Sequence, residues 1–221
     1  MTAKMKYRAS DLEEFRIRFE FQQKLMNSRD PHEFVTEITG TVNVFNEDSD
    51  SFDIPAGQIL LQKIEIERAW ETKAPLFEIF DSVDSELAEL FENFFDIEEN
   101  DFHPHLENLV HPGFGSDLLI VERVEIDPEY RGQDLGLLLV SRAIDALAGG
   151  CQYVATKPFP LQFGLYKKAS VTERNTKGFD KFNGTEAAAT KKISNHWKKL
   201  GFVELPDEPK ILITSPAVRR T

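Results

Sequence analysis

Two glycines stand where a predicted strand gives way to a predicted helix, and this position could serve chemistry. Gly132 and Gly136 fall between the apolar segment 118–126 and the helical pattern of 135–147. Backbone N–H groups at the start of a helix have no partners within the helix, so together with the helix dipole they favour an anion such as a pyrophosphate. A glycine lets the backbone approach a phosphate because it has no Cβ atom. The spacing indicates a phosphate-binding turn, although two glycines at a helix start are more often ordinary turn residues.

The strand before this turn carries a carboxylate in an apolar setting. Strict alternation puts Glu122 on the face of Ile120, Val124 and Ile126, and Glu125 on the opposite face. Removal of Glu122 from water would raise its pKa, which suits a general base that takes a proton from an amine. The alternative is a structural Glu paired with a nearby Arg or Lys.

Other residues with reactive side chains offer weaker candidates. His196 is on the last predicted helix and could reach the same site, although a structural histidine is the simpler interpretation. His103, His105 and His111 lie in a proline-rich loop, and no metal site is expected because ligand histidines usually lie on rigid elements. Cys151 is the single cysteine, so it forms no intramolecular disulfide and is expected to be a small buried apolar residue.

The elements that must position these residues alternate between strand and helix patterns. Strands are predicted at 15–21, 34–45, 58–68, 118–126 and 152–156, and two short ones at 202–205 and 211–214. Helices are predicted at 75–95, with a break near Asp84, at 135–147 and at 186–200, and 158–184 is predicted to be irregular. This order predicts an α/β (α+β) fold in which 118–156 forms a central β-α-β unit.

Composition limits the class of protein. The 221 residues predict one domain, 1–221, and the segment up to Glu14 has no apolar run typical of a signal peptide, so we expect a cytoplasmic protein. The formal net charge of −12 argues against nucleic acid and anionic membranes as partners. Residues 157–199 differ from the rest, with ten basic against three acidic residues. That segment is either an ordinary charged surface in contact with solvent or a surface that attracts an anionic ligand.

Two motifs resemble those of the GNAT superfamily of acyl-CoA N-acyltransferases. The run Arg131-Gly132-Gln133-Asp134-Leu135-Gly136 is similar to the family's acetyl-CoA motif, in which Gln or Arg is followed by two residues, Gly, one residue, and Gly or Ala. Asn195-His196-Trp197-Lys198-Lys199-Leu200-Gly201-Phe202 is similar to the end of a later helix of the family. The resemblance covers about 116–214, and it implies a mixed, mostly antiparallel twisted sheet flanked by helices.

The resemblance also implies an activity and a set of residues. It implies an N-acetyltransferase that passes the acetyl group of acetyl-CoA directly to an unidentified amine in a ternary complex. The pantetheine arm would pair with the strand at 118–126, and the pyrophosphate would rest on 131–137. Glu122 is the expected base, with His196 next in line. The residues expected to bind the cofactor are Val124, Glu125, Ile126, Arg131, Gly132, Gln133, Asp134, Leu135, Gly136 and Leu137.

The sequence departs from the family pattern at two positions. Asp134 stands where the family usually has the first motif glycine, so its carboxylate either lies near the pyrophosphate or caps the helix. Trp197 aligns with a tyrosine that often acts as general acid, and an indole N–H is no proton donor at neutral pH. A GNAT-like CoA-binding or regulatory module without catalysis is therefore the alternative, and a protein-interaction domain is a third. Acceptor identity stays open, as does a homodimer.

Overall fold

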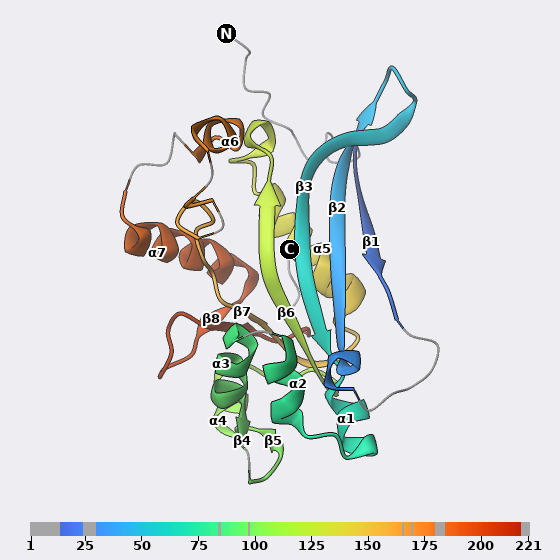
Figure 1. Ribbon diagram of the computed structural model, residues 1–221, viewed down its shortest axis with the longest axis vertical. Helices are drawn as coiled ribbons and strands as arrows, with labels where there is room; N and C mark the ends of the chain where they lie inside the picture. The colour runs from blue at the N-terminus through green and yellow to red at the C-terminus, as the bar shows by residue number, and fades with distance from the viewer. Residues whose placement is uncertain are drawn as a thin grey trace.

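The computed structural model describes residues 14–23, 30–83, 85–96, 98–164, 166–168, 170–179 and 184–217. Its centre is a twisted seven-stranded sheet (Figure 1). The strand order is β1 (Phe15–Phe21), β2 (Val35–Asn46), β3 (Ser51–Ile64), β6 (Gly115–Ile126), β7 (Gly150–Thr156), β9 (Leu212–Thr214) and β8 (Val203–Glu204). Only β6 and β7 pair in parallel among these described strands. The predicted fold class, a mixed and mostly antiparallel sheet flanked by helices, is confirmed.

The amino-terminal strands form a meander. β1 has the predicted bounds, and its Phe15 lies opposite Val44 of β2. β3 was expected at 58–68, but it begins at Ser51 and ends at Ile64, and helix α1 (Ile66–Thr72) follows. The strand prediction failed here because Ile66 and Ala69, three residues apart, are both fully buried on one helical face.

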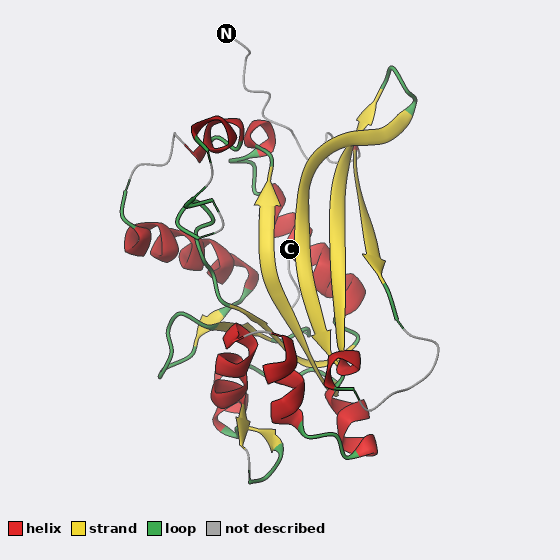
Figure 2. Cartoon of the chain, viewed as in Figure 1, coloured by secondary structure: helices red, strands yellow, loops and turns green. Residues whose placement is uncertain are grey.

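Four helices and a small hairpin follow the meander and cover one end of the sheet (Figure 2). The elements are α1, α2 (Leu76–Val83), α3 (Ser85–Phe94), β4 (Phe95–Asp96), β5 (Asp101–Phe102) and α4 (His105–Leu109). α2 and α3 occupy the range predicted as one helix, and Asp84, the predicted break, lies outside the described residues. Phe91 and Phe95 stack with ring centroids 5.3 Å apart, so the aromatic face is core, as its spacing indicated.

The β-α-β unit is built as predicted. β6 leads through the 3₁₀ turn η3 (Pro128–Tyr130) into helix α5 (Leu135–Leu147), and β7 then returns parallel to β6. Helix α6 (Val171–Thr176) interrupts the segment that was expected to be irregular. Helix α7 (Glu186–Trp197) and the 3₁₀ turn η5 (Lys198–Leu200) precede the last two strands.

Two separate apolar cores lie on the two faces of the sheet. Leu118 and Ile120 of β6 belong to the core that contains α1 to α4. Leu119 and Val121 belong to the core that contains α5. Cys151 is 1% exposed and lies in the α5 core, which confirms that it is a buried residue. Within the described residues, no helix has the length and apolarity that crossing a bilayer requires.

Candidate functional site

The two parallel strands separate halfway along β6. The last paired residues are Val121 and Thr156, and the Thr156 hydroxyl donates to the Val121 carbonyl at 2.8 Å. β6 continues to Ile126, still paired with β3, whereas the chain leaves β7 towards Pro158 (Figure 1). Pro158 has no backbone N–H, so it cannot donate a hydrogen bond that would extend the pairing of β7. Beyond Val121, β6 therefore has no neighbouring strand on the β7 side within the described part of the chain.

A β-bulge in β6 changes the predicted faces. The register passes from Val121 opposite Leu61 to Arg123 opposite Leu60, so Glu122 is the extra residue. The faces predicted by strict alternation are wrong beyond this point because the extra residue shifts the period by one. Val124 and Ile126 consequently pack against the α5 core, on the face of Val121 instead of Ile120.

Glu122 is exposed, and Glu125 is the buried carboxylate of the strand. The apolar surroundings expected for Glu122 are therefore not found, because they depended on a period that the bulge interrupts. Its role as a base stays a prediction.

Glu125 is the centre of a buried polar cluster. Its carboxylate accepts hydrogen bonds from the Tyr166 hydroxyl, at 3.1 and 3.2 Å, from Lys177 Nζ and from Gln58 Nε2. Burial would raise the pKa of Glu125, but the hydrogen bond and charge of Lys177 and the bonds from Tyr166 and Gln58 outweigh it and lower the pKa. The carboxylate therefore stays ionised and fastens the segment of Tyr166 and Lys177 to β6.

Arg131 has a similar structural task. Its guanidinium donates to the carbonyls of Ile126, at 2.6 Å, and Lys177, at 2.8 Å, and lies over the Phe179 ring at 5.3 Å. Burial lowers its pKa, and the charge of Glu125 opposes that effect. The Arg131 side chain thus joins the end of β6 to the segment that follows α6.

The turn between Arg131 and α5, which is predicted to bind a phosphate, has a left-handed backbone at Gly132 and Asp134. Gly132 has φ +81°, and a Cβ atom built there would meet nothing within 4 Å. Gln133 is half-buried beside it. The Asp134 carbonyl accepts the first helical bonds, from the N–H groups of Leu137 and Leu138. The left-handed backbone at 132 favours glycine, and the space beside its Cα atom is open.

Asp134 adopts the conformation for which the family's glycine would be suited. Its φ of 57° is left-handed, which Asp tolerates better than most residues. Its carboxylate makes no helix-capping bond, so the capping alternative is wrong. It lies instead 3.6 Å from Lys199 Nζ and 3.8 Å from His196 Nε2. The neighbouring cation of Lys199 offsets its charge at the mouth of the turn.

The first residues of α5 hold the helix against β6. Leu135 and Leu137 are buried in the α5 core. A Cβ atom on Gly136 would lie 3.6 Å from Ile126 and 3.8 Å from Val124. Gly136 therefore serves the close packing of α5 on the strand, and the space that its missing Cβ leaves faces the strand.

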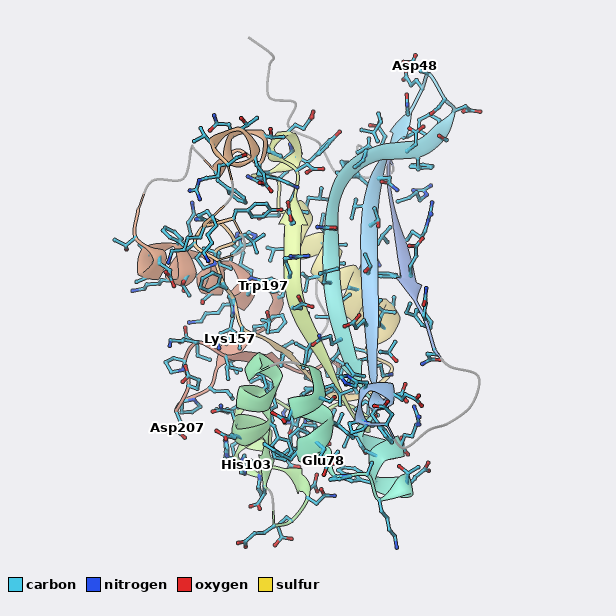
Figure 3. All side chains as sticks on the ribbon, viewed as in Figure 1. Asp48, Glu78, His103, Lys157, Trp197 and Asp207 are labelled. Atoms are coloured by element: carbon cyan, nitrogen blue, oxygen red, sulfur yellow. The ribbon has the colours of Figure 1, made fainter. Side chains whose placement is uncertain are left out.

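His196 and Trp197, the two residues of α7 considered for the site, lie in different surroundings. His196 lies at the phosphate end of the predicted site, against Asp134, and burial and the charge of Lys199 lower its pKa, while Asp134 acts in the opposite direction. Trp197 is partly buried and packs edge-on against Phe202, with ring centroids 5.5 Å apart, so it lies against the α5 core. Figure 3 labels Trp197 on the side of β6 from which β7 diverges, with Lys157 below it.

Other regions do not extend this site. A cavity of about 630 Å³ lies at the opposite end of β6, between Lys63, Glu67 and Asp117. The rings of His103 and His105 stack at 5.3 Å, and no cluster of three metal-ligating side chains forms within the described residues.

Sequence reasoning missed Tyr166, Lys177 and Lys199 as partners of the site. The excess of basic residues in 157–199 was the signal for the two lysines, but composition alone does not pair a lysine with a particular carboxylate, and it gives no signal for Tyr166.

Comparisons with known proteins leave the family open. No protein-family model matches the sequence, and no curated protein matches it. Among solved structures, the chain is similar to the crystal structure of arylalkylamine N-acetyltransferase 2 from Aedes aegypti, with 14% sequence identity and a TM-score of 0.27. The match covers 58% of this chain and 55% of that one, so this chain spans about half the length of that enzyme. An overlap this weak carries no functional argument, and any assignment must rest on the site itself.

Proposed function

We propose that the protein is an acetyl-CoA-dependent N-acetyltransferase of the GNAT type. The observation that carries this proposal is the juxtaposition, within one β-α-β unit, of a strand that parts from its parallel neighbour and a left-handed turn at a helix start. β6 loses its pairing with β7 after Val121, and the turn 131–134 follows the end of β6 after the short 3₁₀ turn η3. The motif resemblance of 131–136 supports the same assignment.

The turn suits the pyrophosphate of CoA. The N–H groups of Leu135 and Gly136 come before the first helical bond of α5, Gly132 leaves open space, and Lys199 lies beside Asp134. An incoming phosphate would compete with Asp134 for Lys199 and His196. These residues fit a polyanion, and the Arg131 side chain acts indirectly by fixing the turn to β6.

The free edge of β6 suits the rest of the cofactor. The pantetheine arm contains amides, and the backbone of 122–126 on the β7 side can pair with them as a strand would. An N–H group of Val124, Glu125 or Ile126 would then polarise the thioester carbonyl. Bound acetyl-CoA supplies the activated acetyl group.

The chemistry then needs positioning and one proton transfer. The amine nitrogen attacks the carbonyl carbon, the C–S bond breaks, and the CoA sulfur leaves as a thiolate that takes up a proton. The amine loses its proton to Glu122, directly or through water, since the exposed carboxylate lies at the point where the strands part.

A CoA-binding module without catalysis is the second candidate. It is favoured by the exposure of Glu122, which lacks the apolar enclosure expected of a base, and by Trp197, which packs against the α5 core. Both candidates require CoA binding and differ in turnover.

One experiment tests the proposal. Calorimetric titration with acetyl-CoA measures binding, and the release of free CoA thiol in the presence of an amine panel measures transfer. We expect binding and amine-dependent release. Binding without release with any amine would favour the second candidate, and an absence of binding at millimolar acetyl-CoA would refute both.

A further inference from the structure

Arg123 is a half-buried cation on β6 that the site described so far does not use. It lies opposite Leu60, on the same face of the sheet as Ile120 and Glu125. Its Nε atom is buried and has no hydrogen-bond partner, and no ion pair is found for its guanidinium among the residues that the structure describes. The Arg123 guanidinium therefore places a positive charge in this half-buried position.

The nearby carboxylate on that face, Glu125, already has other hydrogen-bond donors. Glu125 accepts from Lys177, Tyr166 and Gln58, so its oxygens are satisfied without Arg123. A partly desolvated cation without an anion is costly, whereas a planar carboxylate matches the guanidinium with two parallel hydrogen bonds. No described residue therefore supplies an anion to Arg123, and a ligand that brings one would complete the arrangement.

The position of Arg123 indicates which anion that is. It lies two residues beyond Val121, where β7 leaves β6. The turn proposed for the cofactor phosphates belongs to α5, and α5 packs on the opposite face of the sheet. An acceptor would therefore approach from the face of Arg123, while the cofactor lies on the side of α5.

We propose that Arg123 binds the carboxylate of the acceptor, which is an amino carboxylic acid such as a free amino acid. This inference rests on the proposed acetyl transfer. The amine of such an acceptor would lie within reach of Glu122, the neighbouring residue in the bulge, while its carboxylate is held by Arg123. Arg123 is in this sense a residue that determines acceptor specificity.

Matched acceptors test the proposal. L-phenylalanine is compared with 2-phenylethylamine, L-leucine with 3-methylbutylamine, and L-lysine with cadaverine, so that each pair differs by the carboxylate. We expect the wild type to prefer the acids. Arg123→Gln should lower kcat/KM for the acids about tenfold or more, mainly by raising KM, and leave the amines within about twofold. Arg142→Gln, an exposed arginine of α5, is the matched control and should change neither.

Two further measurements keep the outcome decisive. The melting temperature of unliganded Arg123→Gln should equal or exceed that of the wild type, because a cation without a counter-ion is removed, and a marked fall would show a structural arginine and overturn the proposal. With CoA present, the amino acids should raise the melting temperature of the wild type and not of Arg123→Gln.

The two hypotheses can fail separately. If the wild type acetylates amines but shows no preference for the acids, or if Arg123→Gln weakens acids and amines alike, the acceptor proposal is wrong and the acetyl transfer stands. If no amine is acetylated and the amino acids give no Arg123-dependent shift in melting temperature, the acceptor proposal is wrong as well.

Discussion

Gly132 and Asp134 share a left-handed backbone, but only one of them brings a charge to the turn. The Cβ position of Gly132 faces open space, whereas the Asp134 carboxylate is held near Lys199 and His196. The backbone conformation of the turn and the charge of its side chains can therefore be changed independently. Substitutions that keep the first and change the second can test whether the turn binds an anion.

Gly132→Asp and Gly132→Asn form such a pair. Both residues tolerate a left-handed backbone, and both have space at this position, but only Asp adds a negative charge. We expect Gly132→Asp to weaken acetyl-CoA binding by about tenfold relative to Gly132→Asn, as one added repulsion near a desolvated phosphate would. Calorimetry on the two variants measures the ratio. Equal dissociation constants would place the phosphates elsewhere.

His196 predicts a dependence of CoA affinity on pH. Burial and the charge of Lys199 lower its pKa in the free protein, Lys192 acts in the same direction, and Asp134 opposes them. A phosphate bound nearby would raise that pKa. The gain in affinity is then fully present below the free-protein pKa, itself below 6.5, and is lost as pH rises through the pKa of the complex.

The comparison of wild type with His196→Gln isolates this effect. The phosphate groups of CoA titrate near pH 6 as well, but their contribution cancels between the two proteins. We expect the affinity ratio of wild type to variant to rise by about threefold from pH 8 to pH 5.5, because the imidazole is partly exposed. A ratio that does not change with pH would remove His196 from the phosphate site.

Glu122→Gln tests the proposed base. If the exposed carboxylate accepts the proton, kcat should fall by about 10²-fold, while acetyl-CoA affinity changes little because the backbone and not the side chain would pair with the cofactor. Glu129→Gln, an exposed position on η3, is the control. Glu125→Gln is unsuitable as a control because Glu125 holds Lys177 and Tyr166. An unchanged kcat in Glu122→Gln would mean that another group takes the proton.

At the scale of elements, strands and helices could be predicted where the apolar residues repeat regularly along the sequence. β1 and α5 have the bounds that their periods indicate, since one alternates without interruption and the other runs from a glycine turn to a glycine pair. The bulge at Glu122 could not be predicted, because an extra residue has no signature in a strand of mixed residues. It reversed the burial expected for Glu122 and, with the lysine and tyrosine of a distant segment, made Glu125 the buried acid.

Tyr166→Phe measures how firmly that segment is fastened to β6. The lost hydroxyl bonds a buried carboxylate, so we expect the free energy of unfolding to fall by about 1.5–3 kcal/mol, measured by urea denaturation at neutral pH. Tyr153→Phe is the matched control, since the buried Tyr153 hydroxyl makes no hydrogen bond of ordinary geometry to a described residue and only the Gln152 side chain interacts with it, so its removal should cost little.

Acid should erase the difference between Tyr166→Phe and wild type. The folded-state pKa of Glu125 is lowered below 4.5, so its contribution is present above that value and is lost as pH falls through the folded-state pKa. A destabilisation that stayed constant down to pH 3 would show that packing of the ring, and not the bond to the carboxylate, stabilises the segment.

At the scale of the molecule, β6 and β7 divide into a packed half and a parted half. Up to Val121 and Thr156 the strands are paired, and both apolar cores draw on this half. Beyond it, β6 is supported by β3, by the Glu125 cluster and by α5. A ligand can therefore enter the parted half while the packed half stays closed.

Because Cys151 is buried, the rate at which its thiol is alkylated can report how often the packed half opens. The thiol is 1% exposed, lies opposite Asp117 on β6, and burial raises its pKa to about 12. At pH 8 only about one thiol in ten thousand would be a thiolate, so iodoacetamide should modify it only in molecules whose sheet has opened. Mass spectrometry measures the alkylation rate. If the opened form cannot bind acetyl-CoA, saturating acetyl-CoA should slow alkylation by a factor proportional to the ligand concentration divided by its dissociation constant. A rate that ignores the ligand would mean that strand separation at Cys151 and occupancy of the parted half are independent events.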